Sequence, residues 1–450
     1  MALRFLAFCF TGIIVVALSQ SALEASPNTN SPEFIYTSAP QYDALAWMHG
    51  GERFPKGARI FIHDRTAERL LVPNFASSAD PSLSFDGRRV VFSGKKNIES
   101  PWQVWELAID GGDPRRVSSL ENCIRPLYLP EERLVFACKV DERYVIETQE
   151  LSGGKPLALT YSVENVLPSD VLRDGRILFD SVHPIGSKTI PEIFTVYSDG
   201  SGVESYRCDH GSPRHRGRQV SSGDIIFATD IGLAKFTSAR AQQVPIPAPR
   251  GDYAGDIAET PSGEWLAAWR ENAHATYEIG LLSPGAGALR GIVKPANANA
   301  LQPVPLTQRP LPNRHPSGLH DWPNANLLCL NAYTSKFKFP EGMIQSVRVY
   351  THDGSGPRLL GSAPVERDGS FFVQVPNDRP LQMELVDGAG RTLKRESGYF
   401  WMRRGEQRVC TGCHAGPETA PENAVPQILL KSTNPADLTG TTSAGGAGGH

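Results

Sequence analysis

Apolar and polar residues alternate over short stretches along most of the chain, and glycine-containing turns separate these stretches. One recurring pattern is a tight turn followed by an apolar strand that ends in an aromatic residue, found at residues 86–92, 131–136, 174–179, 222–227 and 262–269. A second pattern is an alternating strand that ends in a glycine turn, found at residues 104–112, 145–154, 193–202 and 277–285. The first pattern repeats roughly every 40 to 50 residues, a period typical of a four-stranded propeller blade.

A partial copy of the same pattern, at residues 58–63 and 70–72, precedes the five full copies. We therefore expect a six-bladed propeller over residues 26–294, or seven blades if residues 286–310 complete another. The stretch DPSLSFDGRRVVFS at residues 80–93 resembles the blades of TolB-like propellers. This resemblance implies an architecture and no particular activity, because propellers serve as scaffolds, binding platforms and enzymes alike.

The pattern changes after the repeats. Residues 295–312 are rich in proline, alanine, asparagine and glutamine, which indicates a linker or an irregular crossing strand. Short alternating strands then follow at residues 327–333, 346–350, 359–361, 369–375, 381–386 and 392–397. They predict a small β-sandwich-like domain over residues 313–432, followed by a flexible glycine-rich tail over 433–450. The fold class is thus all-β, with two domains.

The N-terminus indicates export. A short basic start, an apolar run over residues 5–18 and small residues at 19–22 together predict a signal peptide ending near residue 25. The run is shorter than the ~20 residues that cross a bilayer, so no membrane span is expected and the mature chain should be periplasmic or secreted. Cys123 and Cys138 are candidates for a disulfide there, although spacing alone does not fix their pairing. A net charge of -3 argues against a nucleic-acid partner.

The sequence Cys410-Thr-Gly-Cys413-His414 carries the clearest chemical signal. Two cysteines at this spacing can form thioethers to haem vinyl groups, and the adjacent histidine can bind the iron. A zinc knuckle would need a second ligand pair close by, and a thioredoxin-like pair would need a strand before it and a helix after it. The sequence pattern indicates neither, so we expect one covalent haem c, with His414 as axial ligand.

The haem motif and the strands before it also resemble a known family. The resemblance to the hydrazine synthase alpha subunit middle domain rests on residues 315–317, 328–333, 344–349, 359–361, 364–371, 375–376 and 410–414. It implies a haem-bearing β domain after the propeller. In that family a tyrosine soon after the motif binds the iron and a further domain carries a second haem. Here residues 415–418 read Ala-Gly-Pro-Glu, no tyrosine follows, and hydrazine formation is therefore not expected.

The sequence alone does not select the second axial ligand of the haem iron. Candidates for the sixth position are Met402, His315, His320, His352, His210 and His215. The family resemblance also implies a zinc site that uses Cys329 and His414, in which case the iron would need a different ligand. The alternative for Cys329 is a buried small apolar residue within a strand.

Residues beside the motif have two readings each. Tyr399, Phe400 and Trp401 suit either a haem face or the sandwich core, and Arg403, Arg404 and Arg408 suit either haem propionates or solvent. We expect an extracytoplasmic monohaem c-type cytochrome that exchanges electrons with a partner protein docked on the propeller. The alternative is a haem enzyme, or a subunit of one, that converts a small nitrogen or oxygen compound at an open iron. No Gly-x-Ser-x-Gly elbow in a suitable context suggests a hydrolase.

Overall fold

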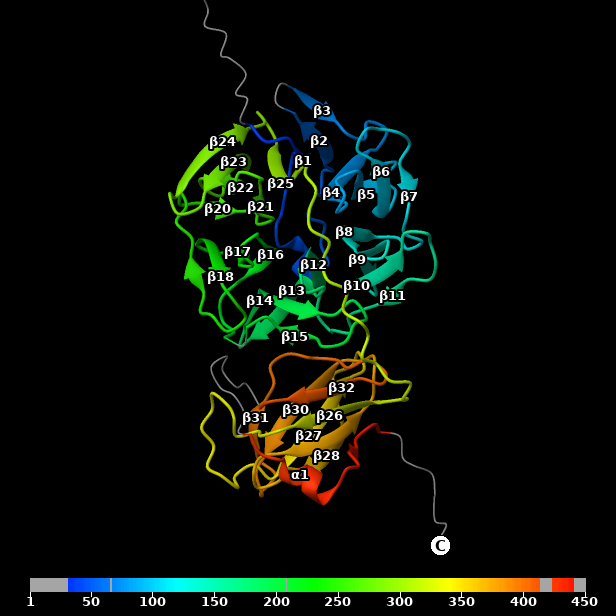
Figure 1. The fold of residues 1–450 in the computed structure, drawn as a ribbon, viewed down its shortest axis with the longest axis vertical. Coiled ribbons are helices and arrows are strands. Elements are labelled where there is room, and N and C mark those ends of the chain that lie inside the picture. The colour runs from blue at the N-terminus through cyan, green and yellow to red at the C-terminus, as the bar shows by residue number, and fades with distance from the viewer. Residues whose placement is uncertain (1–30, 65–66, 208, 413–422, 441–450) are drawn as a thin grey trace, which may run out of the picture.

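The computed structural model describes residues 31–64, 67–207, 209–412 and 423–440, and strands dominate it (Figure 1). The predicted signal peptide, Cys413 and His414 lie outside these residues. The two helical elements in the described residues are a 3-10 turn, η1 (Ala46–His49), and a short α-helix, α1 (Gln427–Lys431). Neither has the length or the apolar character that a bilayer-crossing helix requires.

Residues 34–305 form six antiparallel sheets arranged as the blades of a propeller, which confirms the predicted fold class. Blades two and three contain β4 (Ser77–Leu83), β5 (Arg89–Lys95), β6 (Gln103–Ala108) and β7 (Arg115–Arg116), then β8 (Cys123–Leu129), β9 (Arg133–Val140), β10 (Arg143–Glu150) and β11 (Leu157–Ala158). Blade four contains β12 (Val166–Val171), β13 (Ile177–Ile185), β14 (Lys188–Val196) and β15 (Glu204–Ser205). Blades five and six contain β16 (His215–Gln219), β17 (Ile225–Thr229), β18 (Gly232–Phe236) and β19 (Val244–Pro245), then β20 (Asp252–Tyr253), β21 (Ala258–Glu259), β22 (Trp265–Arg270), β23 (Glu278–Ser283) and β24 (Ala288–Val293).

The first blade closes the ring with strands from both ends of the propeller. Its order is β25 (Asn299–Pro305), β1 (Phe34–Ala39), β2 (Arg59–His63) and β3 (Glu68–Leu70). Residues 299–305, which belong to the proline-rich stretch 295–312, form β25 and pair with β1. The following residues are also fastened to the propeller, since the Arg309 N–H donates to the Phe85 carbonyl (2.9 Å) and the Asn313 N–H to the Arg173 carbonyl (2.7 Å).

Buried charges join the blades on the inside of the ring. Asp80, Arg125, Arg216, Asp256 and Gln302 all have positive φ, between 54° and 59°. Register shifts in the strand pairing flank the first three of them. Such bulges re-aim a side chain, and here they allow carboxylates and guanidinium groups from different blades to pair. The repeats predicted the strands but not this network.

A disulfide joins the two candidate cysteines of the third blade. Cys123 and Cys138 lie directly opposite each other on β8 and β9, and their sulfurs are bonded. Antiparallel pairing brings the two residues together although they lie 15 positions apart in the chain. The disulfide fits the predicted oxidising compartment.

The second domain is a sandwich of two four-stranded sheets, as predicted. One sheet has the order β32 (Gln407–Cys410), β26 (Ala325–Cys329), β29 (Phe371–Val375) and β33 (Ala436–Asp437). The other has the order β28 (Pro357–Pro364), β27 (Ser346–His352), β30 (Leu381–Val386) and β31 (Thr392–Arg395). Apolar side chains such as Leu327, Val349 and Val373 fill the space between the sheets. Because β33 pairs with β29, part of the predicted flexible tail belongs to the sandwich.

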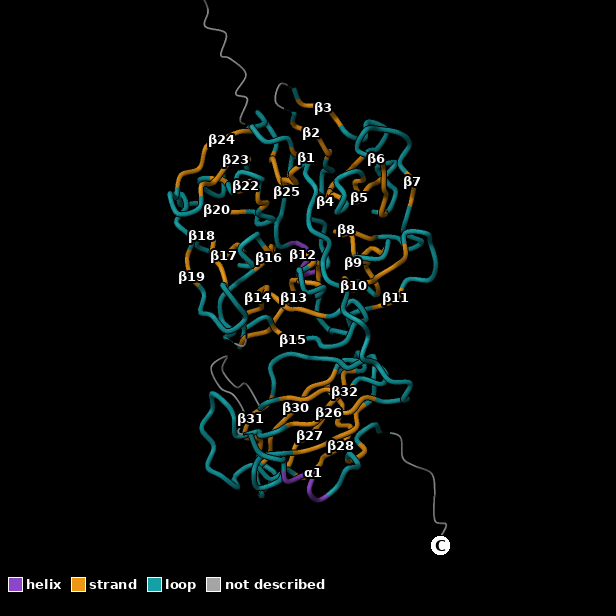
Figure 2. Tube along the Cα trace, in the orientation of Figure 1, coloured by secondary structure: helices purple, strands orange, loops and turns teal. Residues whose placement is uncertain are grey.

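Loops meet where the two domains join (Figure 2). Trp401 of the sandwich is buried in the apolar core of blades three and four, and its indole N–H donates to the Gly200 carbonyl at 3.1 Å. Arg403 donates to the Ala158 carbonyl at 2.7 Å, and Glu406 accepts from the Gly202 N–H at 3.2 Å. These contacts fix the sandwich against the propeller, and the space beside them forms the candidate site.

Candidate functional site

The predicted haem motif begins on a strand that the sequence did not reveal. Cys410 ends β32, an edge strand that pairs in parallel with β26, and its partner there is Cys329. The expectation that no strand precedes the motif, which argued against a thioredoxin-like redox pair, is therefore wrong. The alternation of Gln407 to Cys410 is too short to be recognised, and pairing with β26 is what makes the segment a strand. Cys413 and His414 lie outside the described residues.

Gly412, inside the motif, lies against the turn that follows β26. A Cβ atom at this position would collide with the Thr334 carbonyl oxygen and would lie 3.0 Å from the Asn331 carbonyl oxygen. The motif therefore needs glycine here for close approach of two backbones. This contact fixes the start of the motif at the domain joint.

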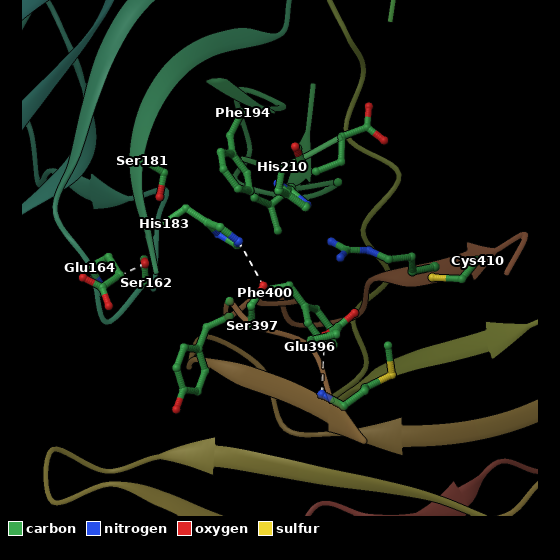
Figure 3. A pocket seen from close by; sticks show the side chains of 18 of the residues that line it. Ser162, Glu164, Ser181, His183, Phe194, His210, Glu396, Ser397, Phe400 and Cys410 are labelled. Carbon is green, nitrogen blue, oxygen red and sulfur yellow. Dashed lines mark hydrogen bonds between the residues drawn. The ribbon is translucent and has the colours of Figure 1, made fainter. Parts of the chain in front are cut away.

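A pocket of about 550 Å³ lies between the sandwich and blade four, with Cys410 in its wall (Figure 3). Cys329, Glu396, Phe400 and Arg408 line it from the sandwich. His183, Phe194, Tyr197 and His210 line it from the propeller. Its volume is in the range of ordinary small-molecule and cofactor sites.

Only one of the six candidates for the sixth iron ligand lines this pocket, namely His210. Met402 is buried in the sandwich core, and His215 is buried in blade five, where burial lowers its pKa to about 4. The remaining three histidines stack on or against aromatic rings: His315 on Tyr197, His320 on Trp322 and His352 edge-on to Tyr399.

Two functional candidates that the sequence did not single out stand next to His210. His183 comes from β13 and Glu192 from β14, and ligand atoms of His183, Glu192 and His210 all lie within 4.8 Å of one another. His210 Nδ1 is 2.5 Å from Glu192 Oε2, and the His183 and His210 rings stack at 4.6 Å. Strand pairing brings His183 and Glu192 together, and no local motif in the sequence marks that pairing.

Glu396 supplies an ionisable group on the sandwich side. Burial raises the pKa of Glu396 to about 7, although the Met383 N–H, Arg408 and His210 oppose this shift. Burial also lowers the pKa of His183, whose Nε2 lies 3.0 Å from Ser397 Oγ. The pocket thus holds a carboxyl that changes protonation near neutral pH beside an imidazole that stays neutral there.

The three arginines near the motif lie in three different environments. Arg408 lines the pocket and pairs with Glu406 at 2.6 Å. Arg403 is buried at the domain joint, and Arg404 pairs with Asp321 on the surface at 2.8 Å. Only Arg408 is therefore placed to meet a pocket ligand. The aromatic residues separate as well, because Tyr399 and Phe400 line the pocket while Trp401 enters the propeller core.

Cys329 is buried, with 1% of its surface exposed, and it also lines the pocket. It packs among the apolar side chains between the two sheets. Both readings of Cys329, a buried apolar residue and a metal ligand, are compatible with this position. Its predicted zinc partner, His414, lies outside the described residues.

Comparison with known proteins points to one family. Residues 334–415 match the family described as the hydrazine synthase alpha subunit middle domain. The curated hydrazine synthase subunit alpha of Kuenenia stuttgartiensis is 30% identical over 114 residues, which is 25% of this chain and 13% of that protein. The aligned segment thus spans a small part of the curated relative.

Solved structures extend the likeness in fold. The Kuenenia stuttgartiensis hydrazine synthase structure aligns with a TM-score of 0.77 at 18% identity, covering 89% of this chain and 71% of that chain. TolB from Acinetobacter baumannii aligns with a TM-score of 0.46 at 14% identity, covering 61% of this chain and 66% of that chain. The first alignment covers most of the propeller and sandwich together. Residues 334–415 are thus similar to the hydrazine synthase alpha subunit middle domain, and the six-bladed propeller that precedes them shares its fold, together with the sandwich, with the hydrazine synthase structure.

Proposed function

We propose that the chain is a haem-binding enzyme or enzyme subunit that converts a small nitrogen or oxygen compound in the pocket between its two domains. The observation that carries this proposal is the position of Cys410, in the wall of a pocket of about 550 Å³ that also holds ionisable groups from both domains. A protein that only passes electrons needs no such groups around its cofactor. A protein that moves protons together with electrons does.

The described residues fit a covalently attached haem c. Cys410 would form one thioether, and Cys413 and His414 of the same motif would supply the second thioether and an axial imidazole. Phe400 and Phe194 offer apolar surface to a flat ring, and Arg408 offers a guanidinium to a propionate. A bound haem would supply redox-active iron.

The chain's own side chains would position the substrate and handle its protons. Glu396, with a pKa near 7, can give or take a proton at neutral pH. His183 stays neutral and can accept a hydrogen bond from a bound hydroxyl or amine, as it does from the Ser397 hydroxyl when Nε2 is the unprotonated nitrogen. These groups suit small polar compounds better than bulky ones.

Electron transfer to a partner protein is the second candidate. Val409, directly before Cys410, is 58% exposed on the edge strand β32, so the start of the motif is near the surface. A partner docked there, or on the propeller, would have a short path to the haem. Export through the predicted signal peptide would place either function in the periplasm or outside the cell.

Optical spectra of the reduced protein with and without carbon monoxide distinguish the two candidates. An open iron in the pocket should bind the gas at once and shift the main absorption band. No shift would indicate a closed iron and favour electron transfer. Haem attachment is tested separately with Cys410→Ala and Cys413→Ala together. Covalent haem that survives this double change on a denaturing gel would contradict both candidates.

A further inference from the structure

The side chains of His183, Glu192 and His210 meet on one face of blade four. His183 is paired with Ile190 across the β13–β14 hairpin, and Ser181 is paired with Glu192, so His183 and Glu192 are diagonal neighbours on the same face. His210 reaches them from the segment between β15 and β16, where its ring stacks on His183 with an interplanar angle of 18°. Two rigid strands and one loop therefore converge on a single point.

Glu192 is a buried carboxylate, 2% exposed, without an arginine or lysine ion-pair partner among the described residues. It accepts from the Gly211 N–H at 3.3 Å and contacts His210 Nδ1 at 2.5 Å. A buried carboxylate is costly unless a cation compensates it. The group that faces Glu192 most closely is an imidazole, which is the commonest side-chain ligand for a metal ion.

Neutral His183 has one ring-nitrogen lone pair, which lies on Nδ1 and is available to a metal ion when Nε2 donates its proton to Ser397 Oγ. Burial lowers its pKa, and the neutral form is the one that binds a metal. The ring is also held in place, because a Cβ atom at Gly398 would lie 2.9 Å from His183 Cε1. The backbone of the sandwich thus packs directly on this ring and fixes its orientation from the second domain.

We propose that His183, Glu192 and His210 form a site for a divalent transition-metal ion of the zinc type, open to the pocket. Two imidazoles and one carboxylate are a common donor set for zinc and for ferrous iron. His183 and His210 also line the pocket, so a fourth position on the ion would face it. This site uses none of the residues of the zinc site predicted at Cys329 and His414, and it does not depend on haem attachment.

Only a small movement is needed to admit an ion. A tetrahedral zinc ion holds nitrogen and oxygen ligands roughly 3.3 Å apart, given bond lengths near 2.0 Å. His210 Nδ1 and Glu192 Oε2 are 2.5 Å apart. Because His210 lies in a loop, rotation of its side chain opens this distance without disturbing the strands. The ion would replace the hydrogen bond between these two atoms, and the displaced proton would pass to solvent.

Zinc titration of the chelator-treated full-length protein, followed by calorimetry, tests the site. Total zinc and iron per chain are measured alongside by mass spectrometry. Glu192→Gln and His210→Ala should each weaken zinc binding at least tenfold and leave the haem iron content unchanged. Ser181→Ala is the matched control, since Ser181 is paired with Glu192 and lines the same pocket but offers no strong ligand. Cys329→Ser removes a ligand of the other predicted site and should leave this binding intact.

The proposal is overturned if Glu192→Gln and His210→Ala bind zinc as tightly as the unmodified protein. It is also overturned if only Cys329→Ser lowers zinc content, or if the variants change the haem spectrum but not the zinc content. His210→Ala alters a loop residue, so it keeps the test valid should Glu192→Gln fail to fold. Loss of haem with zinc retained would count against the proposed function and not against this site.

Discussion

Arg125 and Asp256 form a bidentate ion pair that links blades three and six of the propeller. Arg125 Nη2 lies 2.8 Å from Asp256 Oδ1, and Nη1 lies 3.1 Å from Oδ2. Both side chains are 3% exposed. Burial alone would raise the pKa of Asp256, but Arg125, Arg216 and Arg218 hold it well below its usual range. The pair therefore remains charged at all ordinary pH values.

Asp256→Asn should lower the free energy of unfolding by about 3–5 kcal/mol, because it leaves buried guanidinium groups without their counter-charge. The stability that Asp256 contributes is present above pH ~4 and falls as the pH drops below that value. Urea unfolding at pH 7 and pH 3.5 measures both effects. Asp321→Asn, at an exposed pair with Arg404, is the control and should cost less than about 1 kcal/mol. Equal effects of the two substitutions would contradict the assigned role of Asp256.

Trp401→Ala should make the two domains unfold at different temperatures. Trp401 is 2% exposed and packs with Phe179 of the propeller, their ring centroids 6.4 Å apart. Its removal should cost about 3–5 kcal/mol and open the domain joint. Calorimetry should then show two transitions where the unmodified protein shows one. Trp322→Ala, at a residue 47% exposed, should leave the profile unchanged. A single unshifted transition in Trp401→Ala would show that the joint does not rely on this residue.

Glu396→Gln should stabilise the protein at alkaline pH. The pKa of Glu396 is raised to about 7 by burial, so its contribution to stability falls as the pH rises from ~4.5 to ~7 and stays unfavourable above that. The gain should be roughly 1–3 kcal/mol at pH 8.5, allowing for partial solvent access, and should vanish below pH ~4.5, where the unfolded and folded forms are both protonated. Denaturant unfolding across this range measures it. Glu341→Gln, at an exposed side chain, is the control. A gain that does not depend on pH would rule out titration of Glu396 as its cause.

Gly412→Ala should reduce haem attachment, because the added methyl group collides with the turn at Asn331 and Thr334. We expect at least a severalfold loss of covalent haem per chain, measured as haemochrome absorbance against total protein. Thr411→Ala, at the adjacent exposed position, should retain haem. If the two variants carry equal haem, close backbone contact at Gly412 has no role in attachment.

Much of the fold follows from local sequence. The turn-and-strand repeats locate the second strand of blades two to six, since each buried strand is a short apolar run behind a tight turn. The closing strand β25 was visible only as a proline-rich, irregular stretch, because its identity depends on pairing with β1 far away in the chain. The same holds for β32, which becomes a strand through its partner β26.

The site was predictable in part. Of the residues that line the pocket, Cys410 belongs to the motif that its spacing marks in the sequence, and His210 stood among the candidate ligands. His183 and Glu192 were missed because two strands and a distant loop bring them together, and neither residue has a diagnostic neighbour in sequence. The buried charges were missed for a related reason. Asp80 and Arg125 look like ordinary surface residues until a bulge turns them inward.

The closure of blade one by β1 and β25 sets an order of events during synthesis. The ring cannot be completed until residue 305 has left the ribosome or the export channel, because β1 has no closing partner before then. The pocket forms later still, since its second wall comes from residues beyond 325. Cys410 therefore emerges after the propeller is ready to close. Under the proposed function, the enzymes that attach haem would meet the motif beside a finished propeller wall, so the timing of attachment would decide whether the haem enters the pocket before or after the sandwich docks.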